Sequence, residues 1–261
     1  MEDRKLLIVP DVHGRSFWKK VKDMSQDYKK IIFLGDYLDP YDFDHISSGK
    51  AYNNFKEIIE FKKENIDKVI LLLGNHDMPY YSEDYYNSLR YVSRHMYDLR
   101  DAICSLFNEN KELFTLCHAE EDILFTHAGV DPLWYRQEVK DLEDDINIIT
   151  NGINGLLETK EGILKLNRVT EFRGGRDKNG SCIWNDISDV LWFSNITSDI
   201  NKFKQVFGHT LQVYYNKDYK YVYGQPVEDE NIKMLDTANV YILDVDKYEI
   251  IKIDRDEDNI S

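Results

Sequence analysis

One stretch of the chain, Val69 to Pro79, constrains the fold most strongly. It begins with the aliphatic run Val-Ile-Leu-Leu-Leu, which is too short for an independent helix and is bounded by Gly74. Such a run is typical of a strand buried on both faces of a parallel sheet. Asn75, His76 and Asp77 come next, and these side chains can bind metal or move protons. Because Gly-Asn is also an ordinary turn pair, the rest of the chain must decide between a site and a plain turn.

The same pattern of an apolar strand followed by a polar turn occurs twice earlier in the chain. Residues 6–9 lead to Asp11 and His13, and residues 31–34 lead to Asp36. Segments with helical spacing separate the three runs, so right-handed crossovers are expected to give a parallel sheet. The carboxyl ends of its strands would share one edge, where ligands bind in open α/β sheets. The side chains expected to converge there are Asp11, His13, Asp36, Asn75 and His76.

Two further histidines follow apolar runs in the second half of the chain. Residues 113–116 and 123–125 predict an antiparallel pair of strands, the second of which ends near His127. Residues 206–207 lead to His209, and the remaining apolar segments alternate like short antiparallel strands. These segments predict a second sheet that packs on the first.

Two segments outside this framework are predicted to be helical. From Ser82 to Leu106, apolar residues recur three and four positions apart, which predicts one long amphipathic helix that includes Val92. Residues 131–171 also hold helical spacing beside an acidic flank, and we interpret them as a helical insert next to the site. No linker composition divides the chain, so residues 1–261 are expected to form a single domain around this insert.

Charge and hydropathy exclude several classes of function. The formal net charge of -15 disfavours sequence-independent binding of nucleic acids, which depends on clustered lysines and arginines, and it disfavours anionic membranes. No apolar run reaches the roughly 18 residues of a membrane span. The first residues, Met-Glu-Asp-Arg-Lys, lack the pattern of a secretory signal. A soluble, cytoplasmic protein is therefore expected, and the sequence gives no indication of its oligomeric state.

Six side chains at strand ends have the composition of a site for two metal ions. Metal-assisted attack on phosphorus uses two divalent ions about 3.5 to 4 Å apart, bridged by a shared carboxylate. Mixed imidazole and oxygen ligands favour Mn²⁺, with Fe or Zn²⁺ as alternatives, over an all-oxygen site for Mg²⁺ or Ca²⁺. The predicted ligands are Asp11 and His13 for one ion, Asn75, His127 and His209 for the other, and Asp36 for both.

The order of the motifs, D-x-H-G, G-D-x-x-D, G-N-H-D, T-H-A-G and G-H-T, resembles the calcineurin-like metallophosphoesterase superfamily. The last motif, at residues 208–211, lacks the second histidine of many phosphodiesterases and is similar to the phosphoprotein phosphatase branch. Residues 126–134 and 235–239 are similar to the symmetrical bis(5'-nucleosyl)-tetraphosphatases of that branch. The resemblance implies an α/β fold, a four-layer α/β/β/α metallophosphoesterase sandwich with two mixed sheets flanked by helices.

The resemblance also implies an activity, that of a dinuclear-metal phosphoester hydrolase in which a hydroxide bridging the ions attacks phosphorus. His76 would protonate the leaving oxygen, and Asp39 would orient the His76 ring. The expected substrate is a phosphorylated small molecule, a nucleotide or a phosphoprotein, with phosphomonoesters and phosphoproteins favoured. Hydrolysis of a dinucleoside polyphosphate is an alternative, and a metal-binding interaction module without catalysis is a second one. The complete ligand set argues against the last.

Two phosphate-binding arginines of the family pattern are missing from this sequence. Pro40 and Leu73 stand where those arginines are expected. A guanidinium group binds two phosphoryl oxygens at once, so substitutes are expected elsewhere in the chain. Arg173 and Arg176 flank a Gly-Gly turn between the fourth and fifth motifs, and Arg15 lies just after the first motif. We predict that these three arginines bind substrate.

Overall fold

The apolar runs that precede the polar turns form the centre of one sheet. In the computed structural model, β1 (Lys5–Val9), β2 (Lys30–Phe33) and β3 (Val69–Leu72) are adjacent and parallel, as predicted. Their carboxyl ends therefore share one edge. The structure describes residues 4–89, 94–140, 145–196, 203–217 and 220–253.

Later parts of the chain complete this first sheet on both sides. Among the described residues it has six strands, in the order β13-β12-β1-β2-β3-β4. β12 (Val240–Asp244) is antiparallel to β1, and β13 (Glu249–Ile253) is antiparallel to β12. β4 (Phe114–Thr115) is parallel to β3 at the opposite edge. The sheet is thus mixed, with its site-bearing strands in the centre.

The predicted pairing of residues 113–116 with residues 123–125 was wrong. The antiparallel partner of β6 (Ile123–Thr126) is β5 (Cys117–Glu120), a half-buried strand with a mixed sequence. The apolar run before it contributes β4 to the first sheet instead. The chain passes from one sheet to the other at Leu116, and hydropathy alone does not reveal which sheet a short run joins.

The second sheet is also mixed. In the described part of the chain its order is β10-β11-β7-β6-β5. β7 (Lys204–Phe207) lies parallel to both β6 and β11 (Ile232–Met234), whereas β10 (Val227–Asp229) is antiparallel to β11. β8 (Val213–Tyr215) and β9 (Tyr221–Tyr223) form a separate hairpin. β6 and β7 bring the later histidine motifs to the second sheet.

Alternate residues of the strands define the layers. Leu7 and Val9 of β1 pack in one core with Phe55 of α2 (Ser48–Glu64), while Leu6 of the same strand packs against Phe125 of the second sheet. This arrangement results from the two-residue repeat of a strand, which sends successive side chains to opposite faces.

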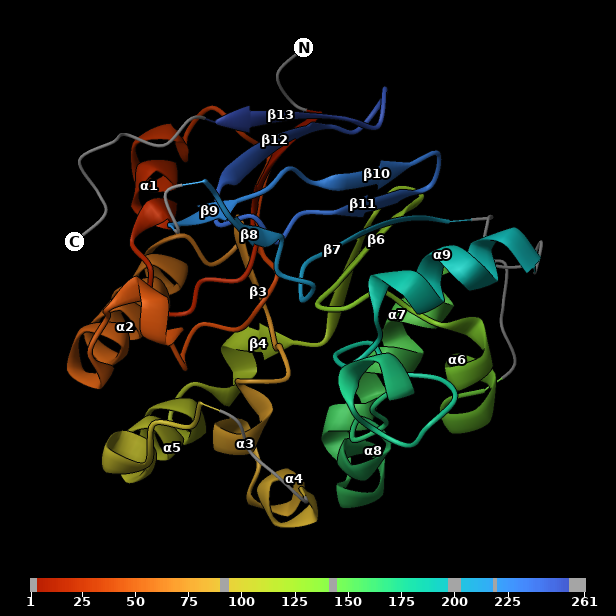
Figure 1. Cartoon of the computed structure of the whole chain (residues 1–261), viewed down its shortest axis with the longest axis horizontal. Helices are drawn as coiled ribbons and strands as arrows, with labels where there is room; N and C mark the ends of the chain where they lie inside the picture. Colours follow the sequence, from red (N-terminus) through yellow and green to blue (C-terminus); the bar gives the residue numbers. More distant parts are fainter. Residues whose placement is uncertain (1–3, 90–93, 141–144, 197–202, 218–219, 254–261) are drawn as a thin grey trace.

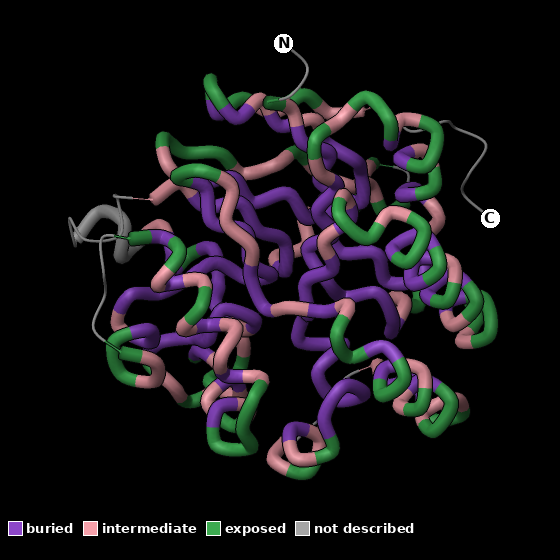
Figure 2. Tube along the Cα trace, turned by 180° about the vertical axis from the view of Figure 1, so that it is seen from behind, coloured by how far each residue is buried: buried purple, intermediate pink, exposed green. Residues whose placement is uncertain are grey.

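The outer face of the second sheet is covered in the same way. Phe207 and Met234 pack with Ile187 and Val190 of α9 (Ile187–Ile196). Figure 1 shows α1 (Lys20–Met24) and α2 on one side of the two sheets, and α6 (Pro132–Glu138), α7 (Ile146–Asn154), α8 (Lys160–Lys165) and α9 on the other. Figure 2 shows that the buried part of the chain lies at the centre of the molecule. The architecture is the predicted four-layer α/β/β/α sandwich.

The remaining helices are short. The α-helices are α1 (Lys20–Met24), α3 (Met78–Tyr81), α4 (Glu83–Ser88), α5 (Arg100–Asn108), α6 (Pro132–Glu138), α7 (Ile146–Asn154) and α8 (Lys160–Lys165). Six 3-10 turns are described, at Phe17–Lys19, Asp42–Asp44, Tyr97–Leu99, Lys111–Leu113, Gly155–Glu158 and Glu171–Arg173. None of the helices that the structure describes is long and apolar enough to cross a membrane.

The predicted long helix from Ser82 to Leu106 is broken into two. The Ser82 side chain caps α4 by accepting from the backbone N–H of Tyr85, but the chain becomes extended at Leu89. Residues 94–96 are not helical, and the next described helical segment is the turn that precedes α5. Val92 lies outside the described residues. The spacing of apolar residues persists through the break, which is why periodicity alone predicts one helix.

The segment 131–171 carries α6, α7 and α8, with residues 141–144 outside the described part. α7 ends where Gly155 begins a 3-10 turn, and Ile149 and Ile153 of this helix are buried in the main core. The interpretation of this segment as an insert within a single domain stays a prediction.

Candidate metal centre

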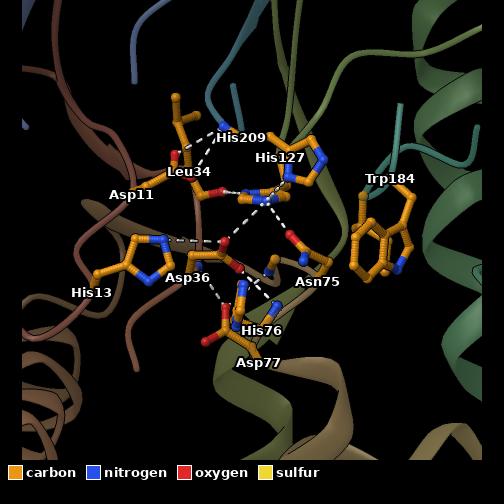
Figure 3. Close-up of polar contacts among 12 residues, drawn as sticks. Asp11, His13, Leu34, Asp36, Asn75, His76, Asp77, His127, Trp184 and His209 are labelled. Atoms are coloured by element: carbon orange, nitrogen blue, oxygen red, sulfur yellow. Dashed lines mark hydrogen bonds and ion pairs between the residues drawn. The ribbon is translucent and has the colours of Figure 1, made fainter. Parts of the chain in front are cut away.

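The six predicted ligand side chains lie together at the carboxyl edge of the sheets (Figure 3). They come from five loops, three that follow strands of the first sheet and two that follow β6 and β7 of the second. All six are buried. They are Asp11, His13, Asp36, Asn75, His127 and His209.

Asp36 occupies the centre of this group. Its Oδ2 atom is 3.5 Å from Nε2 of His13 on one side and 3.4 Å from Nε2 of His127 on the other. Two triads have ligand atoms that all lie within 4.8 Å of one another, and Asp36 belongs to both. Asp11 and His13 complete the first triad, and His127 and His209 complete the second. The arrangement is that of two neighbouring groups of candidate ligand atoms that share one carboxylate.

The polar atoms of the second triad fit a cation. Nε2 of His127 lies 2.9 Å from the amide oxygen of Asn75 and 3.1 Å from Nδ1 of His209. Nε2 of His209 is buried and has no hydrogen-bond partner among the described residues, while Trp184 packs edge-on against its ring at 5.7 Å. A divalent ion could take one nitrogen from each of the two imidazoles and the amide oxygen of Asn75, because imidazole nitrogen and amide or carboxylate oxygen are its usual ligands.

Backbone carbonyls orient two of the imidazole rings. Nδ1 of His13 donates to the carbonyl of Leu38 at 2.8 Å, and Nδ1 of His127 donates to the carbonyl of Leu34 at 2.8 Å. A carbonyl only accepts, so the proton sits on Nδ1 and Nε2 faces Asp36. Burial lowers the pKa of His13 well below its usual value, which keeps this ring neutral and able to bind a metal.

Burial and neighbouring charges shift the pKa values of two predicted ligands. Burial raises the pKa of Asp11 to about 6, and the neighbouring Asp36 carboxylate raises it as well. Burial would lower the pKa of His127, but the charges of Asp36 and Asp11 raise it to about 10. A cation bound here would replace the proton that Asp36 and Asp11 favour on His127, and it would offset the negative charge of the two buried carboxylates.

Backbone strain concentrates at the same residues. Positive φ angles occur at His13 (45°), Asp36 (51°) and His209 (69°), and also at Asp39 (55°). Such angles cost side-chain-bearing residues about 1 to 3 kcal/mol each, and they persist only where the surroundings enforce them. The His13 amide donates to the Asp36 carbonyl at 2.7 Å, and the His209 amide donates to the Asp11 carboxylate at 3.0 Å. These bonds hold the strained loops together.

Two glycines allow backbone to approach the carboxylates. A Cβ atom on Gly74 would lie 2.1 Å from Oδ1 of Asp36, and a Cβ atom on Gly208 would lie 1.9 Å from Oδ1 of Asp11. Any side chain at either position would displace a ligand. The glycines of the G-N-H-D and G-H-T motifs are therefore part of the site.

Asp77 ties two of the motifs together, a role that the sequence alone does not reveal. One carboxylate oxygen accepts from the amides of Asp36 at 2.7 Å and Gly74 at 2.8 Å, and the other accepts from the amide of Tyr37 at 3.0 Å. The side chain is fully buried. Asp77 thereby fixes the loop that carries Asp36 against the loop that carries Asn75.

Replacing Asp77 with alanine is expected to lower the free energy of unfolding by about 3 to 5 kcal/mol, because three buried backbone N–H groups lose their acceptor. Denaturant unfolding of the metal-free protein measures this loss. Asp77→Asn keeps one acceptor oxygen and should lose less. A decrease below about 1 kcal/mol for the alanine variant would show that these bonds do not hold the loops.

His76 and Asp39 form a pair beside the triads. Nδ1 of His76 lies 2.9 Å from Oδ2 of Asp39, whose other oxygen accepts from the hydroxyl of Tyr80 at 2.5 Å. Asp39 is fully buried, and the His76 ring packs edge-on against His13 at 5.2 Å. The carboxylate orients the ring, so that Nε2 of His76 is directed away from Asp39.

Comparison with known proteins identifies the family. A sequence profile described as calcineurin-like phosphoesterase matches residues 4–224, which is most of the chain. The chain belongs to this family. The prediction of a metal-dependent phosphoesterase, a hydrolase, is thereby confirmed. A comparison with curated protein sequences found no significant match.

A solved phosphatase structure shares the fold of this phosphoesterase. A mutant form of a cold-active protein tyrosine phosphatase is 17% identical, with a TM-score of 0.54 over 96% of this chain and 77% of that chain. A metallophosphoesterase from Sphaerobacter thermophilus is 13% identical, with a TM-score of 0.47 over 97% of this chain and 89% of that chain. The finer similarity to bis(5'-nucleosyl)-tetraphosphatases stays a prediction.

The three arginines predicted to bind substrate differ in their surroundings. Arg15 is buried and pairs with Asp44 at 2.9 Å. Arg173 pairs with Asp186 at 2.8 Å and donates to the hydroxyl of Thr210, beside the last ligand motif of the phosphoesterase. Arg176 is exposed, and no described contact joins it to the six ligands. Their roles in substrate binding stay predictions.

A fourth arginine, Arg94, lies at the site of this phosphoesterase, and sequence reasoning missed it. Its Nη2 atom is 2.9 Å from Nε2 of His76, and its Nη1 atom donates to the carbonyl of Asp39 at 2.8 Å. It lies after the break in the predicted long helix and belongs to no family motif. Since residues 82–106 have helical periodicity, no sequence signal marks it as a site residue.

Metal binding is expected to stabilise this phosphoesterase. An ion that binds only the folded state at 100 times its dissociation constant adds about 2.7 kcal/mol of stability. For a chain of this size that corresponds to a rise in Tm of roughly 5 to 11 °C. Thermal unfolding with Mn²⁺ and with a chelator measures the difference, and Asp36→Asn serves as the control. Equal Tm values in both conditions for the unmodified protein would contradict the cation sites.

Proposed function

We propose that the chain hydrolyses phosphomonoesters at two divalent ions, of which Mn²⁺ is the first choice and Fe or Zn²⁺ are alternatives. The single observation that carries this proposal is the position of Asp36, shared by two triads of ligand atoms. Asp11 and His13 would hold one ion with Asp36, while Asn75, His127 and His209 would hold the other. When bound, such ions activate a water molecule and neutralise charge on the phosphoryl group.

The residues around the triads would handle the leaving group. His76 borders Asn75 in sequence, but its ring pairs with Asp39 and lies outside both triads. In this proposal its Nε2 atom gives a proton to the leaving oxygen, and the Asp39 carboxylate holds the ring and stabilises its charged form. The hydroxyl of Tyr80 fixes the Asp39 carboxylate in turn.

The substrate is proposed to be a phosphorylated small molecule or a phosphoprotein. The terminating motif without a second histidine supports a phosphatase over a diesterase. The protein tyrosine phosphatase among the similar solved structures makes phosphotyrosyl esters a sensible first test. A cytoplasmic location and the absence of membrane or nonspecific nucleic-acid partners remain part of the proposal.

A screen for released phosphate tests this function. The Mn²⁺-loaded protein would be offered phosphopeptides, sugar phosphates, nucleotides and dinucleoside polyphosphates, with the chelated protein as the control. Turnover of monoesters well above that of polyphosphates is expected. A preference for dinucleoside polyphosphates would contradict the proposal and support a dinucleoside polyphosphate hydrolase. If no substrate is turned over, the chain would be a metal-binding interaction module without catalysis.

A further inference from the structure

Arg94 has an unusual set of partners for a partly buried arginine. Its two hydrogen-bond acceptors are the Nε2 atom of His76 and the carbonyl oxygen of Asp39, and both atoms are uncharged acceptors. The structure pairs Arg15, Arg100 and Arg173 with carboxylates, whereas it records no carboxylate partner for Arg94 among the described residues. A guanidinium group held in this way retains its affinity for an anion.

The surroundings fix the plane and position of this guanidinium group. It lies over the ring of Tyr41, 3.6 Å from the ring centroid, in a cation–π contact. Phe43 stacks on Tyr41 at 5.0 Å, and His13 packs edge-on against Tyr41 at 4.8 Å. Tyr41 therefore packs against both Arg94 and His13, a residue of the first triad. This packing holds the guanidinium group next to the site.

The contact with His76 places Arg94 where a substrate must lie. Guanidinium nitrogens only donate, so Nε2 of His76 accepts in this contact. The same Nε2 atom is the one that faces a leaving oxygen in the proposed function. A phosphoester bound between His76 and the triads would therefore lie within reach of the guanidinium group of Arg94. Arg94 also donates to the carbonyl oxygen of Asp39. Its guanidinium group therefore lies beside Pro40, the position at which the family pattern has an arginine.

We propose that Arg94 binds the nonbridging oxygens of the substrate phosphoryl group, exchanging its hydrogen bond to His76 for bonds to phosphate. This inference rests on the proposed function, because it assigns a binding residue to the same site. Arg94 would thus supply the phosphate-binding guanidinium group that Pro40 cannot supply. A planar fork binds two oxygens at once, whereas a lysine offers a point charge.

The direct test is binding of inorganic phosphate and orthovanadate to the Mn²⁺-loaded protein, measured by calorimetry. Arg94→Ala is expected to weaken both affinities by about 10-fold or more, with Mn²⁺ affinity unchanged, and Arg94→Lys should recover only part. Arg94→Gln provides a second uncharged variant should the alanine variant not fold. Arg100 is the matched control, because it stacks over Tyr86 at 4.1 Å and pairs with Glu83 at 2.6 Å. Arg100→Ala should leave anion binding unchanged.

Kinetic measurements on the Arg94 variants distinguish a role in phosphate binding from an indirect role in positioning His76. A lost phosphoryl contact lowers kcat/KM by a similar factor, about 10-fold or more, for nitrophenyl phosphate and for an alkyl phosphate. A loss confined to the alkyl ester, with phosphate affinity intact, would overturn the proposal and make Arg94 a positioning residue for His76. Unchanged phosphate affinity in both uncharged variants would also overturn it. If the unmodified protein turns over no ester yet binds phosphate through Arg94, the proposed function fails, and Arg94 is an anion-binding residue without a substrate role.

Discussion

Asp36→Asn is expected to bind less metal and to lose nearly all turnover. Oδ2 of Asp36 lies 3.5 Å from Nε2 of His13 and 3.4 Å from Nε2 of His127, so both proposed cation sites would lose their shared charge. In the unmodified protein the backbone N–H of His76 donates to Oδ1 of Asp36 at 2.9 Å. The side-chain oxygen of an asparagine can accept the same bond, so the loop should keep its conformation. A loss of several kcal/mol in transition-state stabilisation corresponds to a rate reduction of about 10³-fold or more.

Metal content and initial rates at saturating Mn²⁺ measure the effect of this change. Asp42→Asn is the matched control, because Asp42 is an exposed aspartate of the same loop and should behave like the unmodified protein. Retention of more than about a tenth of the rate would contradict the bridging role, since a shared ligand at a two-ion site should contribute far more.

His76→Asn is expected to keep the metals yet lower the rate by about 10² to 10⁴ on substrates with poor leaving groups. The reason is geometric: the His76 ring bonds to Asp39 and Arg94 and belongs to neither triad. A nitrophenyl leaving group needs little protonation, so its hydrolysis should slow much less. Rates for a nitrophenyl ester and an alkyl ester, with metal content measured in parallel, check this expectation.

His45→Asn is the matched control for this change. His45 lies in the neighbouring loop and has a φ of 54°, a conformation that asparagine adopts readily. An equal loss on both esters in the His76 variant would remove the general-acid role and point to a structural effect. Asp39→Asn should give a smaller loss with the same leaving-group dependence, because the ring would lose its charged partner.

The parallel core and the ligand cluster could be predicted from the sequence because both depend on local patterns. A buried strand is a continuous apolar run, and the polar residues after each run gather at one edge of a parallel sheet. Thus Asp36 and Asn75 could be placed together without a structure. The same reasoning explains why His127 and His209 could be added from the second sheet.

Other features depend on contacts that no local pattern encodes. Leu116 divides an apolar run between two sheets, and hydropathy does not mark the point of division. Leu89 leaves the helix although the apolar spacing continues to Leu106. Arg94 reaches His76 through a left-handed backbone at φ 49°, and Asp77 acts by accepting backbone N–H groups. These contacts are set by tertiary structure, which overrides propensity.

The distribution of the ligands over two sheets has a consequence for synthesis of the protein. Asp11 bonds to the His209 amide across 198 positions of sequence. At about 5 to 20 residues per second, the ribosome needs roughly 10 to 40 s to make that interval. β12, which pairs with β1, is made later still. A chain interrupted before residue 209 carries Asp11 and Asp36 but lacks the last histidine. The full set of predicted ligands therefore exists only after the strands of the second sheet have been made, and a shorter translation product would lack part of the proposed metal site.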